Sequence, residues 1–134
     1  MKIRKEKDVV ILELIADDLS DPRRMSVILE RLLLEEGERK IVADLSQIDS
    51  IYSIQIGSLV TMHVMCYENV AVMKLAGAND KVKNLLRMVG LETMMEMHHG
   101  AEVAAQSFGT TPAPSAKPRS GRPADPRVRN APNL

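Results

Sequence analysis

The sequence predicts an α/β fold, in which helices pack against one mixed sheet. Two apolar runs, residues 9–14 and 40–45, are rich in β-branched residues and bounded by turn signals, as strands covered on both faces are. Between and after these runs, apolar residues recur at helical spacing. Strands that alternate with helices indicate a sheet covered by helices.

The first part of the chain is expected to form two strands and a helix. Residues 2–5 should pair as an edge strand with the run at 9–14, across a charged turn at 6–8. Asp21 can cap a helix, and Pro22 suits the first helical position. Gly37 should stop that helix. Its apolar positions are Met25, Ile28, Leu29, Leu32 and Leu33.

The elements after the second strand follow the same logic. A helix should begin near Ile54. A third strand is expected at 70–75, a helix from Asn79 or Asp80 to Gly90, a short strand at 94–97 and a last helix at 101–108. The helix near Ile54 should turn one face inward, formed by Ile56, Leu59, Val60, His63, Val64 and Tyr67.

Composition separates the chain into a domain at 1–108 and a tail at 109–134. The tail is dense in Pro, Ser, Ala and Arg, so we expect it to be disordered. Five of the 18 basic residues but only one of the 18 acidic residues lie in it, which leaves a slightly acidic domain. That distribution argues against direct binding of nucleic acid by the domain. The tail's Ser120–Pro123 is similar to the Gly-Arg-Pro core of minor-groove peptides, with serine where that motif has arginine.

The domain shows no arrangement typical of an enzyme. Cys66 is the only cysteine, His98 and His99 have no further ligand nearby in sequence, and no phosphate-binding or dinucleotide-binding glycine pattern occurs. We therefore expect no catalytic residues, no metal and no cofactor. His63 and Cys66 are interpreted as core or junction residues. No apolar run is long enough for a transmembrane segment or a signal peptide, which favours a cytoplasmic location.

The junction IDSIYSIQIGSLV, residues 48–60, carries the main functional signal. Ser53 lies where the helix should begin, so it is expected to act as the N-cap. A phosphate there would meet the positive end of the helix dipole. Ser53 is therefore the candidate phosphorylation site, with Ser58 as the alternative and Ser50 as a further spare hydroxyl.

The helix that follows has a second face without charge. A solvated face would carry Lys and Glu, whereas this one carries small and soft residues, which is typical of a helix that meets a partner or is buried all round. We favour the partner. The predicted partner-binding residues are Ile54, Ser58, Thr61, Met62 and Met65.

These segments resemble the STAS domain of anti-sigma factor antagonists. Asp44-Leu45-Ser46 matches the Asp-Leu-Ser of that family, Ser53 falls on its phosphorylatable serine, and Gly57 matches the second glycine of its Asp-Ser-x-Gly-x-Gly pattern. A later segment with Leu85, Leu86, Gly90 and Leu91 is also similar. The chain departs from the pattern at Tyr52, Ile54 and Gln55, where the family has aspartate, a small residue and glycine.

The resemblance implies a non-enzymatic partner-switching regulator. Its expected partner is a serine kinase of the histidine-kinase-like ATPase class that doubles as an anti-sigma factor, with phosphorylation at Ser53 as the switch. The alternative is a scaffold without a switch, as a subunit of a stressosome-like or lipid-transport complex. The three departures from the family pattern favour this alternative.

Overall fold

The computed structural model describes residues 1–110, and a five-stranded sheet forms its centre. The strands lie side by side in chain order, β1-β2-β3-β4-β5. β1 runs antiparallel to β2, and every later pair is parallel. The bounds are β1 Lys2–Glu6, β2 Val9–Glu13, β3 Lys40–Asp44, β4 Val72–Ala76 and β5 Met97–His98.

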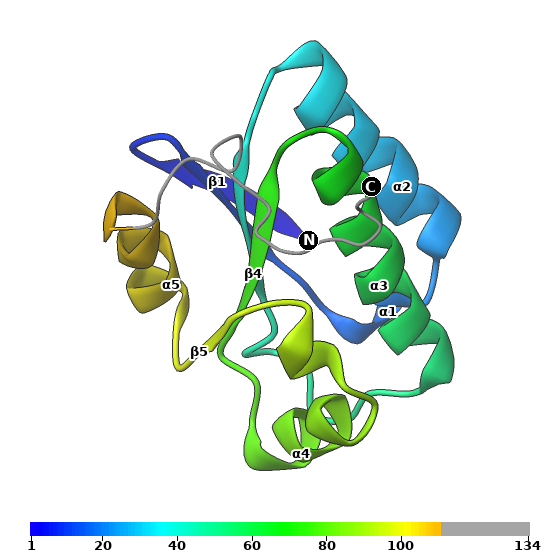
Figure 1. Ribbon diagram of the computed structural model, residues 1–134. Helices are drawn as coiled ribbons and strands as arrows, with labels where there is room; N and C mark the ends of the chain where they lie inside the picture. The colour runs from blue at the N-terminus through cyan, green and yellow to red at the C-terminus, as the bar shows by residue number, and fades with distance from the viewer. Residues whose placement is uncertain (111–134) are drawn as a thin grey trace, which may run out of the picture.

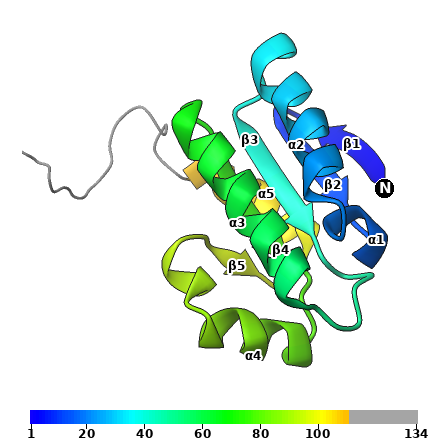
Figure 2. The ribbon, with the colours of Figure 1, turned by 90° about the vertical axis from the view of Figure 1, so that its right-hand side faces the viewer.

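The helices form two layers of unequal size (Figure 1). α1, α2, α3 and α4 lie on one side of the sheet, and α5 lies on the other. Figure 2 looks onto the larger layer, where α2 and α3 lie side by side over the sheet. The bounds are α1 Ala16–Leu19, α2 Pro22–Glu30, α3 Ser53–Glu68, α4 Asp80–Met88 and α5 Ala101–Ser107.

The structure confirms the predicted α/β class and most of its elements. Asp21 caps α2 by accepting a hydrogen bond from Arg24 N at 3.1 Å, and Asn79 caps α4 by accepting one from Val82 N at 2.8 Å. Gly37 and Gly90 both have positive φ, as the ends of helical segments require. The predicted tail, 109–134, lies outside the described residues from position 111 onward.

Four features differ from the sequence-based expectation. α1 was not predicted, and α2 continues as one turn of π-helix at Arg31–Glu35. β4 begins two residues later than expected, because Val70 adopts a positive φ of 55° in the turn that precedes it. β5 is only the pair Met97–His98, because the chain before it forms a 3₁₀ turn at Leu91–Thr93.

The apolar core lies mainly between the sheet and the larger helical layer. Alternate strand residues such as Val10, Leu12 and Ile41 point into it, while their neighbours point toward α5. The smaller cluster under α5 comprises Val9, Ile11, Val42, Ala76, Ala101, Ala104, Ala105 and Phe108. The sheet is therefore buried on both faces at its centre.

A buried lysine joins α5 to the sheet. Lys74 is 1 % exposed, and its Nζ lies 2.7 Å from Ser107 Oγ, 3.1 Å from Glu96 Oε1 and 4.3 Å from the centre of the Phe108 ring. Burial works to raise the pKa of Glu96, but hydrogen bonds from His98 and Lys74 outweigh it and lower that pKa. The charge on Lys74 is thus compensated where it is buried.

Among residues 1–110, no helix has the length and apolar character needed to cross a membrane.

Candidate functional site

The loop that leads to α3 is anchored at the end of β3. Leu45 N donates to Ala76 O at 2.8 Å, and Asp44 Oδ1 accepts from Ser46 N at 3.0 Å. Gly77 lies against this turn with a φ of +75°, and a Cβ there would come within 2.9 Å of Asp44 Oδ1. Position 77 therefore needs glycine for both its conformation and its space.

The prediction that Ser53 is the N-cap of α3 is wrong. Tyr52 occupies the cap position in an extended conformation, and Ser53 is the first residue of the helix. Gln55 supplies the capping interaction instead, because its Oε1 accepts from Tyr52 N at 2.9 Å. The side chain of the third helical residue thus satisfies the backbone N–H of the cap residue, as in the second half of a capping box.

Ser53 is exposed at a helix terminus with unused hydrogen-bond donors. Within residues 1–110, the N–H groups of Ser53 and Ile54 have no acceptor, whereas those of Gln55 and Ile56 both donate to Tyr52 O. Free N–H groups and the dipole favour negative charge at this end of a helix. The position can therefore accommodate a phosphate electrostatically.

Two buried polar side chains join α3 to α1. Ser58 is 0 % exposed, and its Oγ donates to Leu19 O at 2.6 Å. Gln55 Nε2 donates to Ser20 Oγ at 3.0 Å and lies 3.3 Å from Ala16 O. The Ser58 hydroxyl satisfies Leu19 O at the carboxyl end of α1, while Gln55 adds a bond to Ala16 O, which already accepts from Ser20 N. We call this contact the α1–α3 clasp.

The preceding loop is held from the other side by α4. Asn79 Nδ2 donates to Asp49 O at 3.1 Å, and Lys81 Nζ donates to Ser50 Oγ at 3.1 Å. The segment that presents Ser53 is therefore fixed between α1 and α4, so its exposed side chains project from a constrained backbone.

Part of the predicted partner-binding face is buried, which corrects the sequence-based expectation. Ser58 and Met62, at 0 % and 1 % exposed, pack inside the domain, and Met65 is half-buried against the core. Burial also removes Ser58 as an accessible alternative phosphorylation site. Both α1 and α2 pack against α3, and Ser58 bonds to Leu19 of α1, so this face of the helix is turned into the domain.

The exposed face of α3 contains two of the five predicted partner-binding residues, Ile54 and Thr61. Val64 and Tyr67, which were expected to face inward, are 41 % and 69 % exposed. Tyr52 and Ile54 are 66 % and 54 % exposed on either side of Ser53. We define the α3 surface as Tyr52, Ser53, Ile54, Gly57, Thr61 and Val64, all of which are exposed.

Cys66 and His63 of α3 are buried and half-buried, in line with their interpretation as core or junction residues. Cys66 is 1 % exposed, and burial raises the pKa of its thiol to about 12. His63 is half-buried, and loss of hydration lowers its pKa. Neither residue is placed as an exposed nucleophile or base.

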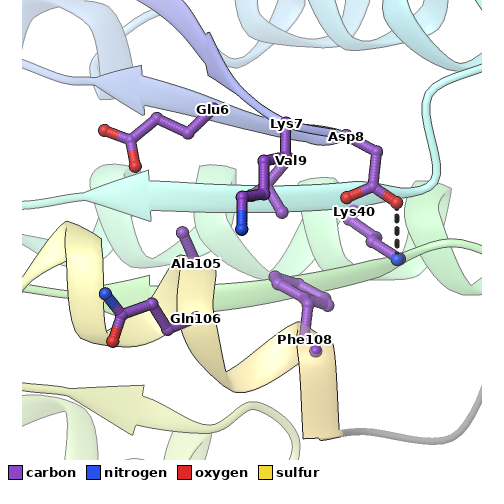
Figure 3. A pocket seen from close by; sticks show the side chains of 9 residues that line it. Glu6, Lys7, Asp8, Val9, Lys40, Ala105, Gln106 and Phe108 are labelled. Carbon is purple, nitrogen blue, oxygen red and sulfur yellow. Dashed lines mark hydrogen bonds and ion pairs between the residues drawn. The ribbon is translucent and has the colours of Figure 1, made fainter.

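A hollow of about 260 Å³ lies between the β1–β2 turn and α5 (Figure 3). Three of its charged side chains, Glu6, Asp8 and Lys40, form ion pairs. Lys40 Nζ lies 2.6 Å from Asp8 Oδ2, which lowers the pKa of Asp8, and Glu6 pairs with Arg4. Val9, Ala105 and Phe108 form its apolar part. The described lining offers no histidine, cysteine or serine for acid–base or nucleophilic chemistry.

Comparison with known proteins identifies the fold. The sequence matches no family model and no curated protein. A chain of the stressosome, described as a signal integration and transduction hub, aligns with a TM-score of 0.72 at 16 % identity and covers 81 % of this chain and 96 % of that one. A protein from Thermotoga maritima described as an anti-sigma factor antagonist has a TM-score of 0.63 at 22 % identity, over 79 % and 92 % of the two chains.

A third structure names the domain. An anti-sigma-factor antagonist (STAS) domain protein from Planctomyces limnophilus aligns with a TM-score of 0.56 at 14 % identity, over 80 % of this chain and 97 % of that one. The chain therefore has the STAS fold that the sequence resemblance predicted.

Proposed function

We propose that this chain is a non-enzymatic, cytoplasmic partner-switching regulator that binds its partner through the α3 surface. The partner is a serine kinase of the histidine-kinase-like ATPase class that also acts as an anti-sigma factor. Phosphorylation of Ser53 by that kinase dissociates the complex of this chain with its partner. One observation carries the proposal: Ser53 is exposed at the free N-terminus of α3, between two exposed apolar side chains, on a STAS fold.

The chemistry of the α3 surface supports a switch. Tyr52 and Ile54 offer apolar area to a partner, and aromatic anchors are frequent at the centre of interfaces. A phosphate between them brings roughly −2 charge into a contact that must lose its water. The helix terminus tolerates that charge in the free protein, whereas an apolar partner face does not. Phosphorylation is therefore expected to weaken binding without unfolding the domain.

Pull-down from host lysate with full-length variants tests the surface. Ile54→Lys should lose the ATPase, identified by mass spectrometry, because the lysine charge would have to be desolvated in the interface. Val27→Lys is the matched control, since Val27 is 60 % exposed on α2, outside the α3 surface. Equal recovery of the ATPase by both variants would exclude the α3 surface as its docking site.

A second experiment tests the switch itself. Ser53→Asp should release the ATPase while Ser53→Ala retains it, and both should keep the thermal stability of the wild type. Phosphopeptide mass spectrometry on protein from the native host should find phosphate on Ser53. The switch is wrong if Ser53 is unmodified under every growth condition tested and Ser53→Asp binds as wild type does.

The alternative is a STAS scaffold without a switch, in a stressosome-like or lipid-transport complex. Gln55 favours it, because the side chain that replaces the family's glycine is 5 % exposed and part of the α1–α3 clasp. The start of α3 is thereby fixed against α1 by a buried side chain, as suits a rigid scaffold surface. An assembly that co-purifies regardless of substitution at Ser53 would support this alternative.

A further inference from the structure

The edge of the sheet beyond β4 is only partly covered. β4 pairs with β3 at all five of its residues, but with β5 only at Leu75 and Ala76. Figure 1 shows β5 beside only the carboxyl-terminal end of β4. The amino-terminal half of β4 therefore has a neighbour on one side only.

The hydrogen bonds show which backbone groups this leaves open. Val72 N donates to Arg39 O, on the β3 side, at 2.9 Å. Leu75 N and Gly77 N donate to Glu96 O and His98 O, on the β5 side, at 2.9 and 3.0 Å. Successive residues of a strand alternate in direction, so the N–H and C=O of Met73 must point to the β5 side.

Met73 finds no backbone partner there. The chain that would continue β5 toward Met73 turns away, because Met94 N and Met95 N both donate to Leu91 O. Within residues 1–110, the N–H and C=O of Met73 have no hydrogen-bond partner, although the residue is 2 % exposed. A backbone pair that is buried and unsatisfied costs free energy until a partner supplies the missing bonds.

A cleft of about 180 Å³ lies beside this edge. Its size is below the roughly 300–1,000 Å³ of ordinary small-molecule pockets, so it has room for one side chain rather than for a cofactor. Its exposed lining residues are Tyr67 and Met94, at 69 % and 41 %, and the charged Glu96. The remaining lining residues are His63, Ala71, Val72, Met73, Lys74 and Met95.

This edge also lacks the usual protection of an exposed strand. Natural edge strands carry charged side chains that discourage pairing, and β1 shows that pattern with Lys2, Arg4 and Lys5. The open part of β4 carries Val72 and Met73, and the charge of Lys74 is turned under α5 toward Ser107. An extended chain can therefore approach the edge without meeting a free charge of β4.

We propose that the open edge of β4 binds an extended peptide of a partner protein, which adds a strand beside Met73 and places one apolar side chain in the cleft. The occupant follows from the open groups. The N–H and C=O of Met73 point to the same side, as they do in a β-ladder, so an extended backbone is the partner that can bond to both. The adjoining cleft would then select the side chain of that peptide. The site lies beside Tyr67 at the carboxyl end of α3, away from Ser53, and is independent of the proposed switch.

Amide hydrogen exchange on the full-length protein tests the open edge. The Met73 amide should exchange at least tenfold faster than the Leu75 amide, because only Leu75 has an acceptor on the β5 side. Equal protection of the two amides would show that the edge is already paired and would overturn the proposal.

Selection of random peptides displayed on phage against the full-length protein tests the occupant. Selected peptides should slow exchange at Met73, and N-methylation of their central peptide bond should weaken binding at least tenfold. Met94→Lys should weaken binding to a similar degree, since it replaces an exposed apolar side chain of the cleft by a charged one. Met88→Lys is the control, because Met88 is 80 % exposed on α4 and does not line the cleft.

Three further outcomes would overturn the proposed peptide site, and one separates it from the Ser53 switch. Selection of no peptide, or of peptides that bind Met94→Lys as tightly as wild type, would overturn the proposal. So would sedimentation that shows dimers abolished by Met94→Lys, because the occupant would then be a second copy. Peptides should bind Ser53→Asp unchanged, so a failed switch and a failed edge site are told apart.

Discussion

At the scale of the residue, the α1–α3 clasp explains the hydroxyl groups at the start of α3. Ser58 serves packing, because its hydroxyl satisfies a carbonyl inside the domain, whereas Ser53 remains exposed. Two serines five positions apart thus have opposite environments. Substitution by alanine should separate their roles.

Ser58→Ala should lower the free energy of unfolding by about 1–3 kcal/mol, because it leaves Leu19 O buried without its donor. Ser53→Ala should change it by less than about 0.5 kcal/mol, as exposed substitutions usually do. Urea denaturation of both variants measures the difference. Equal stabilities would mean that the clasp contributes nothing to folding.

Cys66 should be unreactive in the folded protein and should lower stability at alkaline pH. Its pKa is raised to about 12 by burial, so the native thiol stays protonated where an unfolded thiol, with a pKa of about 8.5, ionises. Below pH 8.5 both states hold the proton and there is no effect. As the pH rises toward 12, the unfolded state gains relative stability.

Thiol titration with a disulfide reagent at pH 8 should therefore be slow until urea is added. The pH dependence is checked by denaturation between pH 8 and 10, where Cys66→Ala should lose less stability with rising pH than wild type. A fast native reaction would mean that the thiol is accessible.

At the scale of the element, α3 shows why its existence was predictable and its orientation was not. Apolar residues occupy two faces of this helix, so the sequence pattern fits more than one rotation about its axis. The neighbouring α1 and α2 pack against α3 and select the rotation in which Ser58 and Met62 are buried. That choice depends on tertiary packing, which periodicity along one helix does not contain.

Met62→Lys should therefore unfold or strongly destabilise the domain, by about 3 kcal/mol or more, because it buries an unpaired charge in the core. Val64→Lys, two residues on and 41 % exposed, is the matched control and should melt close to wild type. Thermal melts of the two variants check this. A stable Met62→Lys variant would mean that α3 turns its other face to the sheet.

At the scale of the whole molecule, the α/β class and the order of elements could be read from the sequence, while several contacts could not. The runs at 9–14 and 40–45 form central strands, because a continuous apolar, β-branched segment is buried best in a strand that is covered on both faces. α1 escaped prediction since four residues carry too little periodicity. The open edge of β4 arises from a missing partner, which no local pattern can signal.

The same view predicts where the chain can be shortened. Phe108 is 5 % exposed and belongs to the cluster under α5, so the essential chain extends at least to that residue. A chain ending at Thr110 should keep its melting temperature within about 4 °C of full length. A chain ending at Ser107 should lose substantially more, because it deletes an aromatic core residue. Calorimetry on the two truncations decides whether the domain boundary lies there.

The agreement between strand order and chain order has a consequence for how the protein is made. Each parallel strand finds its neighbour already synthesised, so the sheet can grow in step with translation. Among residues 1–110, however, α5 and Phe108 come last, and they pack over Val9, Ile11 and Val42. A nascent chain that ends before Ala101 would have a nearly complete sheet with one apolar face exposed to water. That interval is when the growing polypeptide is most in need of a chaperone.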